Sequence, residues 1–284
     1  MAYDSEFVEF WNTILVPKFL RFQDILVQGL GKHSRVIFAR DAVAKPGERV
    51  LDVGCGFGDT AIDLARQVGP AGCVVGIDCC RAFLDICRVD AEQAVLGNIE
   101  WVESDAETHE FDVPFDLWFS RFGTMFFSLP VAALRHLRTQ LKPGGRMMMI
   151  VWHKRDLNLW AALPRDVVLR FLPEPESPDT CGPGPFSMAS EEIVTQQLHA
   201  AGYTDIAFMP VDAPIMVGRN LDDAIDFQLA IGPAGEIHRE AGKLAERKSD
   251  EIRTALEQAL APYLTDEGVV LPSTSWCITA RNPS

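Results

Sequence analysis

A run of glycines directly after a short apolar segment is the first feature of the sequence that could bind a ligand. Residues 51–58 read LDVGCGFG and lie between a predicted strand and a predicted helix. Glycine lets the backbone approach a ligand closely, and the first turn of a helix presents N–H groups without intrahelical partners. NAD and flavin proteins have similar turns, and so do strand-to-helix connections that bind nothing. The run alone therefore indicates a candidate nucleotide site and no more.

Polar residues at the ends of the next predicted strands favour the nucleotide interpretation. Asp78 closes the run VVGIDCC, and Asp105 closes the strand before Ala106 in VESDAE. Asp78 can accept hydrogen bonds from both hydroxyls of a ribose, whereas Asp105 can accept from an adenine amino group. Ser120 and Arg121 end the fourth strand. Because open α/β sheets bind ligands at the carboxyl edge of their strands, these residues predict one shared site.

Short β-branched runs alternate with helical patterns along the chain, which is typical of a parallel sheet covered by helices. The predicted strands are residues 49–53, 73–77, 99–103, 115–119, 146–152 and 275–280. The run LKPGG at 141–145 predicts a turn before the fifth strand, because proline and glycine break regular structure. A strand pair, or one long bent strand, is expected over 206–217. The fold class is therefore α/β.

Helical patterns outside this alternation predict a cap and two insertions. Residues 1–45 are expected to form an N-terminal helical cap, and residues 46–284 the main domain. Insertions at about 154–187 and 219–266 are expected to form lids. Between them, Ser187 or Ser190 can begin a helix that Gly202 ends.

Together, these runs resemble the nucleotide-binding motifs of class I S-adenosylmethionine-dependent methyltransferases. The group similar to ubiquinone/menaquinone biosynthesis C-methyltransferases fits best, since LKPGG before a strand and a late strand pair also agree with it. The resemblance is specific over roughly residues 46–152. It implies a Rossmann-like, doubly wound sheet of seven strands whose last strand is antiparallel. It also implies an enzyme that transfers a methyl group from S-adenosylmethionine to a small molecule.

The resemblance further implies which residues bind the cofactor. They are Asp52, Gly54, Cys55, Gly56, Asp78, Cys79, Asp105, Ala106 and Ser120. In this assignment Asp52 shapes the loop, and Gly54, Cys55 and Gly56 line the methionine portion of the cofactor. Asp78 holds the ribose while Cys79 packs on the adenine. Asp105 and Ala106 bind the adenine edge, and Ser120 meets the methionine amino group through its backbone carbonyl. Cys55 is interpreted as a small buried thiol and not as a nucleophile.

Methyl transfer from a sulfonium needs mainly a nucleophile held in line with the methyl carbon in a dry pocket. A general base is required only if the acceptor must lose a proton. His153, directly after the fifth strand, is the candidate base, with a hydrogen-bonded edge histidine as the alternative. Arg121 can pair with an acidic substrate or with a neighbouring carboxylate.

Large apolar side chains in the cap and insertions are the candidate walls of the acceptor pocket. They are Trp11, Phe19, Trp160, Phe186, Met188 and Phe227, with Arg121 at the sheet edge. Each alone is compatible with ordinary core packing. Together they indicate an apolar or aromatic acceptor enclosed by a mobile lid.

Composition narrows the possible partners. The 284-residue chain carries a formal net charge of -14, which disfavours nucleic acid. No apolar run approaches the roughly 20 residues that span a bilayer, and the start lacks a signal-peptide pattern. The seven cysteines include no pair at CxxC spacing, so we expect no metal site and a cytoplasmic location. The second insertion could carry a homodimer interface.

Two alternatives remain open from the sequence. A methyltransferase-like scaffold could bind S-adenosylmethionine without transferring its methyl group, because cofactor motifs survive loss of an acceptor site. An NAD-type oxidoreductase is the other alternative, although such folds do not require the Asp105 strand end or LKPGG. Binding of S-adenosylhomocysteine but not NADH would separate the oxidoreductase from the methyltransferase.

Overall fold

A seven-stranded sheet forms the centre of the computed structural model, which describes residues 6–40, 42–175 and 183–283. The strand order is β3-β2-β1-β4-β5-β10-β6. The strands are β1 (Arg49–Val53), β2 (Cys73–Asp78), β3 (Ile99–Glu103), β4 (Phe115–Arg121), β5 (Leu141–Trp152), β6 (Thr204–Asp212) and β10 (Thr274–Arg281). Only β10 departs from the parallel arrangement, because it pairs antiparallel with both β5 and β6. This order confirms the predicted fold class.

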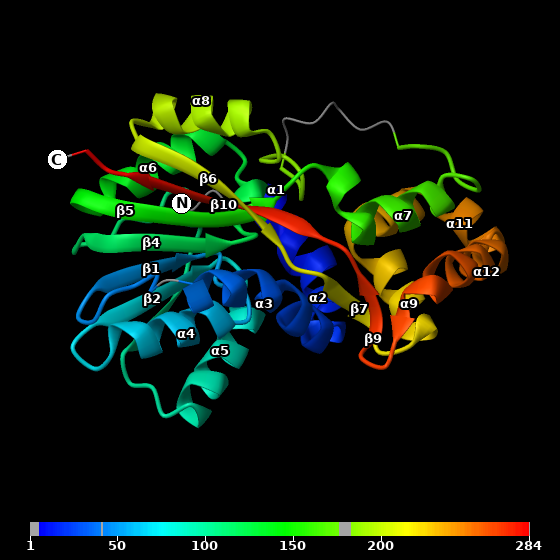
Figure 1. Ribbon diagram of the computed structural model, residues 1–284, viewed down its shortest axis with the longest axis horizontal. Coiled ribbons are helices and arrows are strands. Elements are labelled where there is room, and N and C mark those ends of the chain that lie inside the picture. The colour runs from blue at the N-terminus through cyan, green and yellow to red at the C-terminus, as the bar shows by residue number, and fades with distance from the viewer. Residues whose placement is uncertain (1–5, 41, 176–182, 284) are drawn as a thin grey trace.

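Helices cover both faces of this sheet (Figure 1). One face carries α3 (Gln23–Arg40), α4 (Asp59–Val68) and α5 (Arg81–Gln93). The other carries α6 (Pro130–Thr139) and α8 (Glu191–Ala201). The strands between the two layers are buried as continuous apolar runs, with Leu117, Trp118 and Phe119 at most 1% exposed. Burial on both faces is what a parallel sheet requires.

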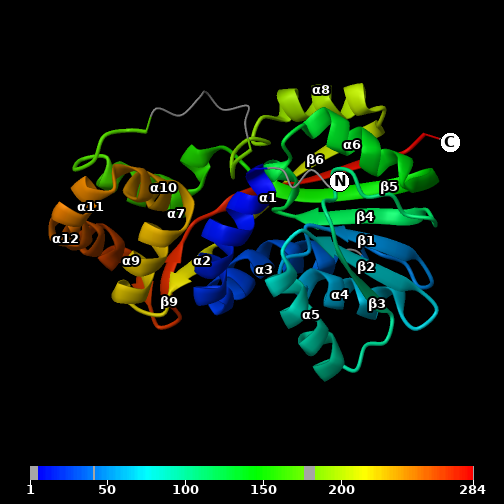
Figure 2. The ribbon, with the colours of Figure 1, turned by 180° about the vertical axis from the view of Figure 1, so that it is seen from behind.

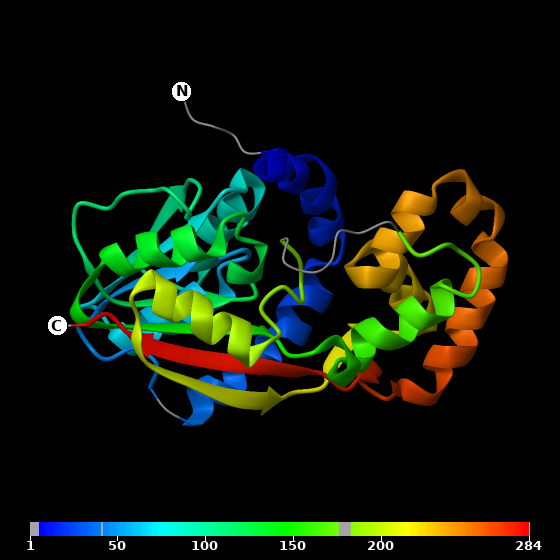
Figure 3. The same cartoon turned by 90° about the horizontal axis from the view of Figure 1, so that it is seen from above.

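The N-terminal segment leaves the sheet and crosses toward a second group of helices (Figure 3). It contains α1 (Glu6–Phe10), a π-helical turn η1 (Trp11–Leu15) and α2 (Val16–Arg21), followed by α3. The second group comprises α7 (Leu159–Val168), α9 (Leu221–Ala230), α10 (Gly232–Ala241), α11 (Lys243–Arg247) and α12 (Ser249–Leu260). Figure 2 shows these helices packed together at the end of the molecule away from α4 and α5. Short 3-10 turns are η2 (Thr124–Phe126), η3 (Arg155–Leu157) and η4 (Ala261–Tyr263).

A small three-stranded sheet beside these helices was not predicted. Its order is β7-β9-β8, from β7 (Ile215–Gly218), β9 (Gly268–Leu271) and β8 (Leu264–Thr265). The expected strand region 206–217 is therefore a pair of strands, but the two belong to different sheets. Residues 213–214 separate them, and the distant β9 supplies the pairing partner that the local sequence does not specify.

The predicted turn at LKPGG is wrong in one respect, because β5 already begins at Leu141. Its pairing with β4 jumps from Leu141 opposite Phe115 to Arg146 opposite Leu117, so the loop is an irregularity inside the strand. The far C-terminal Asn282 stabilises it: its N–H donates to the Gly145 carbonyl at 2.9 Å, and its carbonyl accepts from Gly144 at 3.0 Å.

The predicted caps of α8 are confirmed. Ser190 is the N-cap, and its hydroxyl accepts a hydrogen bond from the Ile193 N–H. Gly202 follows the helix with φ +94°, the left-handed conformation that favours glycine. Part of the first predicted lid, residues 176–182, lies outside the described residues.

Candidate functional site

The glycine-rich loop connects the end of β1 to the start of α4. Gly54, Gly56 and Gly58 all have positive φ, between +53° and +77°. A Cβ built on Gly56 would meet no atom within 4 Å, whereas one on Gly54 would lie 3.3 Å from the Cα of Gly123. The loop thus leaves open space directly above Gly56. A ligand could approach its backbone there.

Asp78, at the end of β2, faces this loop. One carboxylate oxygen accepts the Gly56 N–H at 2.9 Å, and the other accepts the Cys80 N–H at 2.9 Å. The residue is 9% exposed, and this burial raises the pKa of Asp78, while the two N–H groups act in the opposite direction. Each oxygen retains a second lone pair, so the carboxylate can still accept from a ligand hydroxyl.

The neighbouring strand end brings Asp105 to the same edge. The Ser104 N–H donates to the backbone carbonyl of Asp78 at 3.1 Å, which joins the two strand ends. One Asp105 oxygen accepts from the Glu107 N–H at 2.8 Å and holds a turn that contains Ala106. Asp105 and Ala106 are both half-buried. The structure therefore assembles Gly56, Asp78 and Asp105 at one edge, as the sequence predicts.

Asp52 lies beneath the loop and is fully buried. One of its oxygens accepts from the Thr60 hydroxyl at 2.7 Å, and the other has no hydrogen-bond partner. Burial raises the pKa of Asp52 to about 7, against the opposing effects of the Thr60 hydroxyl and Arg121. An unpaired buried carboxylate oxygen is costly, and a cationic ligand group nearby would lower that cost.

Arg121 at the end of β4 pairs with a neighbouring carboxylate, the second alternative from the sequence. Its two terminal nitrogens bind the two oxygens of Asp59 at 2.6 and 2.7 Å, and one also donates to Ser34 at 3.2 Å. Asp59 is the first residue of α4, so the pair ties β4 to the helix that follows the glycine loop. Beside it, the Ser120 hydroxyl donates to the Val53 carbonyl at 2.7 Å and holds β4 to β1.

Phe122, which the sequence analysis missed, follows Arg121 with φ +59°. A bulky residue in this region is strained, and such strain concentrates at functional sites. Its ring stacks on Trp152 at 4.1 Å between centroids, with an interplanar angle of 21°. The next residue, Gly123, lies against Gly54 of the loop. The sequence carries no signal for this conformation, because phenylalanine rarely adopts it.

Two of the predicted acceptor residues form an aromatic cluster with side chains of η2 and α5. Trp11 lies edge-on to Phe19 at 5.2 Å and to Phe126 at 5.1 Å, and Phe19 lies 6.2 Å from Phe83. The Asn12 amide also donates to the backbone carbonyl of Cys79 at 3.3 Å. These contacts attach the N-terminal segment directly to the residues beside Asp78.

A second aromatic series runs from β5 into the first insertion. Trp160 lies 5.0 Å from Trp152 and 6.4 Å from Phe186. Phe227 packs on Phe22 at 5.5 Å. Trp160, Met188 and Phe227 are at most 5% exposed, whereas Trp11, Phe19 and Phe186 are half-buried. The predicted acceptor residues therefore fall into separate groups, and the half-buried ones are the more accessible to a ligand.

The geometry of His153 does not favour a general base. Its Nδ1 accepts the Lys154 N–H at 2.6 Å, so the neutral ring carries its proton on Nε2 and lacks a free lone pair. The ring stacks on Trp276 at 4.1 Å, which places it over β10. Partial burial lowers the pKa of His153, and Lys154 acts in the same direction. This is the hydrogen-bonded edge histidine that the sequence left as the alternative.

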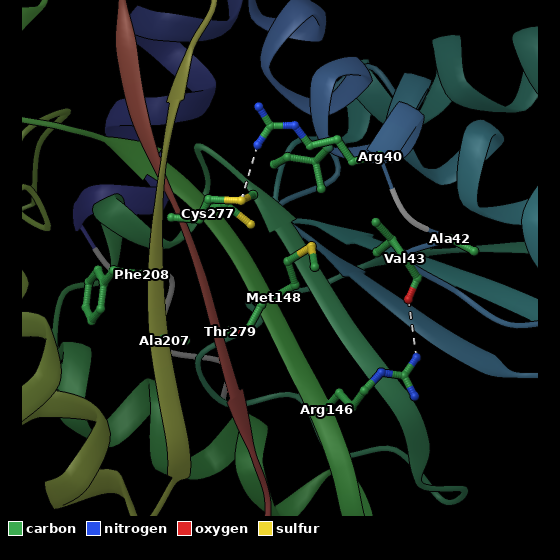
Figure 4. A pocket seen from close by; sticks show the side chains of 11 residues that line it. Arg40, Ala42, Val43, Arg146, Met148, Ala207, Phe208, Cys277 and Thr279 are labelled. Atoms are coloured by element: carbon green, nitrogen blue, oxygen red, sulfur yellow. Dashed lines mark hydrogen bonds between the residues drawn. The ribbon is translucent and has the colours of Figure 1, made fainter.

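A cavity of about 300 Å³ lies elsewhere, between the end of α3 and strands β5, β10 and β6 (Figure 4). Arg40 and Arg146 lie at its sides, and Met148 and Cys277 contribute to its floor. Arg146 is already committed to a bidentate pair with Glu48. None of the predicted site residues lines this cavity. It is therefore separate from the edge where Asp78 and Asp105 meet.

Comparison with known families identifies the domain that this edge belongs to. Residues 50–145 match the family model described as a methyltransferase domain. This segment therefore resembles a methyltransferase domain. The matched range holds the glycine loop, Asp78, Asp105 and Ser120, so the predicted class I methyltransferase fold is confirmed by both the match and the strand order.

Proteins similar to this chain include enzymes named ubiquinone/menaquinone biosynthesis C-methyltransferase. The protein from Pseudomonas putida is 34% identical over 161 residues, and that from Ectopseudomonas mendocina is 32% identical over the same length. The matched segment is 56% of this chain and 63% of each relative. The chain thus spans less than two thirds of the relatives it matches.

Solved structures share the fold at lower identity. The YcgJ protein from Bacillus subtilis is 17% identical, with 89% of this chain and 99% of that chain covered and a TM-score of 0.56. Phosphoethanolamine N-methyltransferase 2 from Haemonchus contortus, solved with S-adenosyl-L-methionine, is 16% identical. That match covers 99% of this chain and 61% of the other, with a TM-score of 0.60. Among the residues that the structure describes, no helix is both long and apolar enough to cross a bilayer.

Proposed function

We propose that this protein transfers the methyl group of S-adenosylmethionine to a small organic acceptor. The observation that carries the proposal is the arrangement of Asp78 opposite Gly56, with both oxygens held by backbone N–H groups and open space above the glycine. A carboxylate fixed in this way, next to a backbone without side chains, suits the ribose of a nucleoside. Asp105 at the adjacent strand end suits the adenine amino group.

The residues of this edge also fit the charge of the cofactor. S-adenosylmethionine, when bound, supplies a methyl group on a positively charged sulfur, and its amino group is also cationic. The unpaired oxygen of Asp52 beneath the loop favours a cation in this region. The open space at Gly56 leaves the methionine portion a path along the backbone. The bidentate pair with Asp59 offsets the positive charge of the Arg121 guanidinium.

The contribution of the protein to the reaction is mainly position and exclusion of water. An in-line displacement on a methyl carbon gains most from holding the two reactants in contact, and needs little covalent help. The stacked pair of Phe122 and Trp152 and the edge-on contact of Trp11 with Phe126 provide apolar surfaces around the strand ends. A dry environment of this kind suits transfer to a nucleophile that must shed its water.

The acceptor that suits these surfaces is apolar or aromatic. The half-buried rings of Trp11, Phe19 and Phe186 come from the N-terminal segment and the first insertion. The matched relatives are named for ubiquinone/menaquinone biosynthesis, and a quinone-like ring is compatible with these side chains. General-base catalysis by His153 is not part of the proposal, since its Nδ1 lone pair is occupied.

The strand order favours a methyltransferase over an NAD-type oxidoreductase. Dinucleotide folds have the order 3-2-1-4-5-6, whereas here β10 inserts antiparallel between β5 and β6. A non-catalytic scaffold would share this order and the cofactor residues. Only an assay of methyl transfer separates it from an enzyme.

Calorimetric titration with S-adenosylhomocysteine, with NADH as the control, tests the cofactor. We expect micromolar affinity for the former and no heat from the latter. Incubation with labelled S-adenosylmethionine and a panel of quinols, phenols and aliphatic amines then tests transfer. Binding without transfer to any member would favour the scaffold, and absence of binding would contradict the proposed function.

Two further expectations belong to this proposal. The six cysteines that the structure describes are all free thiols, which suits a reducing compartment such as the cytoplasm. A homodimer through the second insertion would double the mass measured by sedimentation equilibrium. A monomer at all concentrations would contradict it.

A further inference from the structure

Two adjacent cysteines follow Asp78 at the cofactor edge. The Sγ atoms of Cys79 and Cys80 lie 3.7 Å apart. Cys79 is half-buried and Cys80 is 1% exposed. Asp78, Cys79 and Cys80 are the one group of at least three side chains in the described part of the chain that could share a bound atom, all ligand atoms lying within 4.8 Å of one another.

Disulfide formation does not suit this pair. The two residues are neighbours across a trans peptide, so their Cα atoms are about 3.8 Å apart. Disulfides usually join Cα atoms at about 4.4–6.8 Å, with sulfurs about 2.05 Å apart. Closing the bond would therefore require the backbone to move at the N-terminus of α5. One bridging atom needs no such movement, because two bonds of about 2.3 Å, the length of a zinc–sulfur bond, reach across 3.7 Å.

The number of ligands that the group offers selects the kind of bridging atom. A zinc ion in a structural site takes four protein ligands, whereas this group offers three. An electrophile that needs only two sulfurs is therefore favoured. Trivalent arsenic has this chemistry, since it exchanges oxygen for sulfur with loss of water.

We propose that Cys79 and Cys80 form a bidentate site for trivalent arsenicals, and that its occupation blocks cofactor binding. An arsenical R–As=O reacts with both thiols to give R–As bonded to the two sulfurs, plus one water. Two S–H bonds and the arsenic–oxygen bonds break, and two As–S bonds form. The thiol protons leave with the oxygen. Arsenic remains trivalent, so no oxidant or reductant is needed.

Blocking follows from the position of the pair, and this part rests on the proposed function. The Cys80 N–H holds one Asp78 oxygen, and the Cys79 carbonyl accepts from the Asn12 amide of the N-terminal segment. A group bonded to both sulfurs would occupy space beside the carboxylate that receives the ribose. It would also disturb the contact between the N-terminal segment and this edge.

Phenylarsine oxide is the probe, and intact-protein mass spectrometry is the first measurement. We expect one adduct that has lost water, mapped by peptide analysis to residues 79–80. Cys80→Ser removes one sulfur and keeps a good N-cap for α5. It should lose the dithiol adduct. Cys87→Ser is the matched control, because Cys87 is a buried thiol on the same helix whose Sγ donates to the Gly56 carbonyl.

The second measurement is S-adenosylhomocysteine affinity before and after treatment. The wild type and Cys87→Ser should lose at least about tenfold in affinity, about 1.4 kcal/mol. A dithiol should restore the affinity and a monothiol at the same concentration should not. Cys80→Ser should retain its own untreated affinity.

Each outcome of these experiments tests one part of the proposal. An adduct that maps elsewhere, or that forms equally on Cys80→Ser, overturns the site. An adduct at residues 79–80 with unchanged cofactor affinity overturns the blocking effect. If the untreated wild type binds no S-adenosylhomocysteine, the proposed function fails, while the mass measurement still tests the dithiol site by itself.

Discussion

At the residue scale, Asp78 serves the loop and the candidate ligand with the same two oxygens. Its bonds to the Gly56 and Cys80 N–H groups fix the carboxylate before any ligand arrives. Preorganisation of this kind lowers the entropy cost of binding. The same bonds mean that truncation to alanine would leave two backbone donors unpaired. A milder substitution is the better test.

Asp78→Asn should weaken S-adenosylhomocysteine binding ten- to a hundredfold, about 1.5–3 kcal/mol. The amide replaces one acceptor oxygen by an NH₂ group, which faces either a backbone N–H or a ribose hydroxyl unfavourably. Calorimetry measures the change. Asp85→Asn is the control, since Asp85 is an exposed acid on α5 that pairs with Arg88. An unchanged dissociation constant in folded Asp78→Asn would show that the ribose binds elsewhere.

The raised pKa of Asp52 leads to a separate prediction about how stability depends on pH. Its pKa is about 7 in the folded protein and 3.8 when unperturbed, so between these values the folded state binds more protons than the unfolded state. The contribution of Asp52 to stability therefore falls as pH rises from about 4 to 7, by at most on the order of 4 kcal/mol. Asp52→Asn removes this titration.

Urea denaturation at pH 5 and pH 8 checks the expectation for Asp52→Asn. Relative to the wild type, the variant should be more stable at pH 8 than at pH 5. The comparison between the two proteins cancels the titration of groups that both contain. A difference that is the same at both pH values would contradict a raised pKa.

At the element scale, the C-terminus of α5 carries a residue that suits its conformation poorly. The Leu96 N–H donates to the Ala91 carbonyl and the Val95 N–H to that of Glu92, the two bonds of a Schellman motif. Val95 occupies the left-handed position at φ +56° and is 88% exposed. A β-branched side chain is strained there and makes few contacts in return.

Val95→Gly should raise the free energy of unfolding by about 1 kcal/mol, because glycine removes most of the strain. Val89→Gly is the matched control. Val89 is a half-exposed residue inside the same helix, where glycine should cost about 1 kcal/mol. Thermal denaturation of both variants measures whether each substitution raises or lowers the free energy of unfolding. Destabilisation by both would show that the strain at Val95 is negligible.

At the scale of the whole molecule, His33 joins the two ends of the chain. It lies on α3, fully buried, with Nδ1 2.8 Å from the Ser275 hydroxyl and Nε2 2.9 Å from that of Ser273. Ser273 donates its own proton to the Ala213 carbonyl, so it must accept from His33, and the neutral ring carries its proton on Nε2. Burial, with Arg121 second, lowers the pKa of His33 to about 4.

Because the pKa of His33 in the folded state is below the unperturbed value of 6.5, its contribution is present above pH 6.5 and is lost as pH falls toward 4. The expected loss is about 3 kcal/mol at most. Urea denaturation at pH 7.5 and 5.0 measures it. His33→Gln should be less stable at pH 7.5 but show a smaller decrease at pH 5.0. An equal decrease in both proteins would assign the acid sensitivity to other groups.

Local patterns predicted the strands of the sheet and the position of Gly56, Asp78 and Asp105 at one of its edges. The strands at residues 49–53 and 99–103 have the predicted bounds, because short apolar runs between turns leave little choice of conformation. The pairing of the Gly-rich loop with Asp78 also follows from local order, since both lie at consecutive strand ends. The role of each residue toward a cofactor remains a prediction that the binding experiments test.

Contacts between distant segments could not be predicted from the sequence alone. Arg121 had two candidate partners, and only the position of α4 against β4 selected Asp59. The small sheet requires β7 to pair with β9, from Ile215 opposite Leu271 to Gly218 opposite Val269, far apart in the sequence. The two serines that form hydrogen bonds with His33 lie some 240 residues away in the sequence.

The sequence by itself determined the α/β fold class, the glycine loop and the carboxylates at the strand ends, because backbone preferences and strand periodicity act over a few residues. The tertiary structure alone decided which oxygen of Asp52 stays unpaired, that Phe122 is held at positive φ, and that His153 uses its Nδ1 lone pair. These features depend on the packing of segments far apart in the chain. A side chain's partner is chosen by that packing and not by its neighbours in sequence.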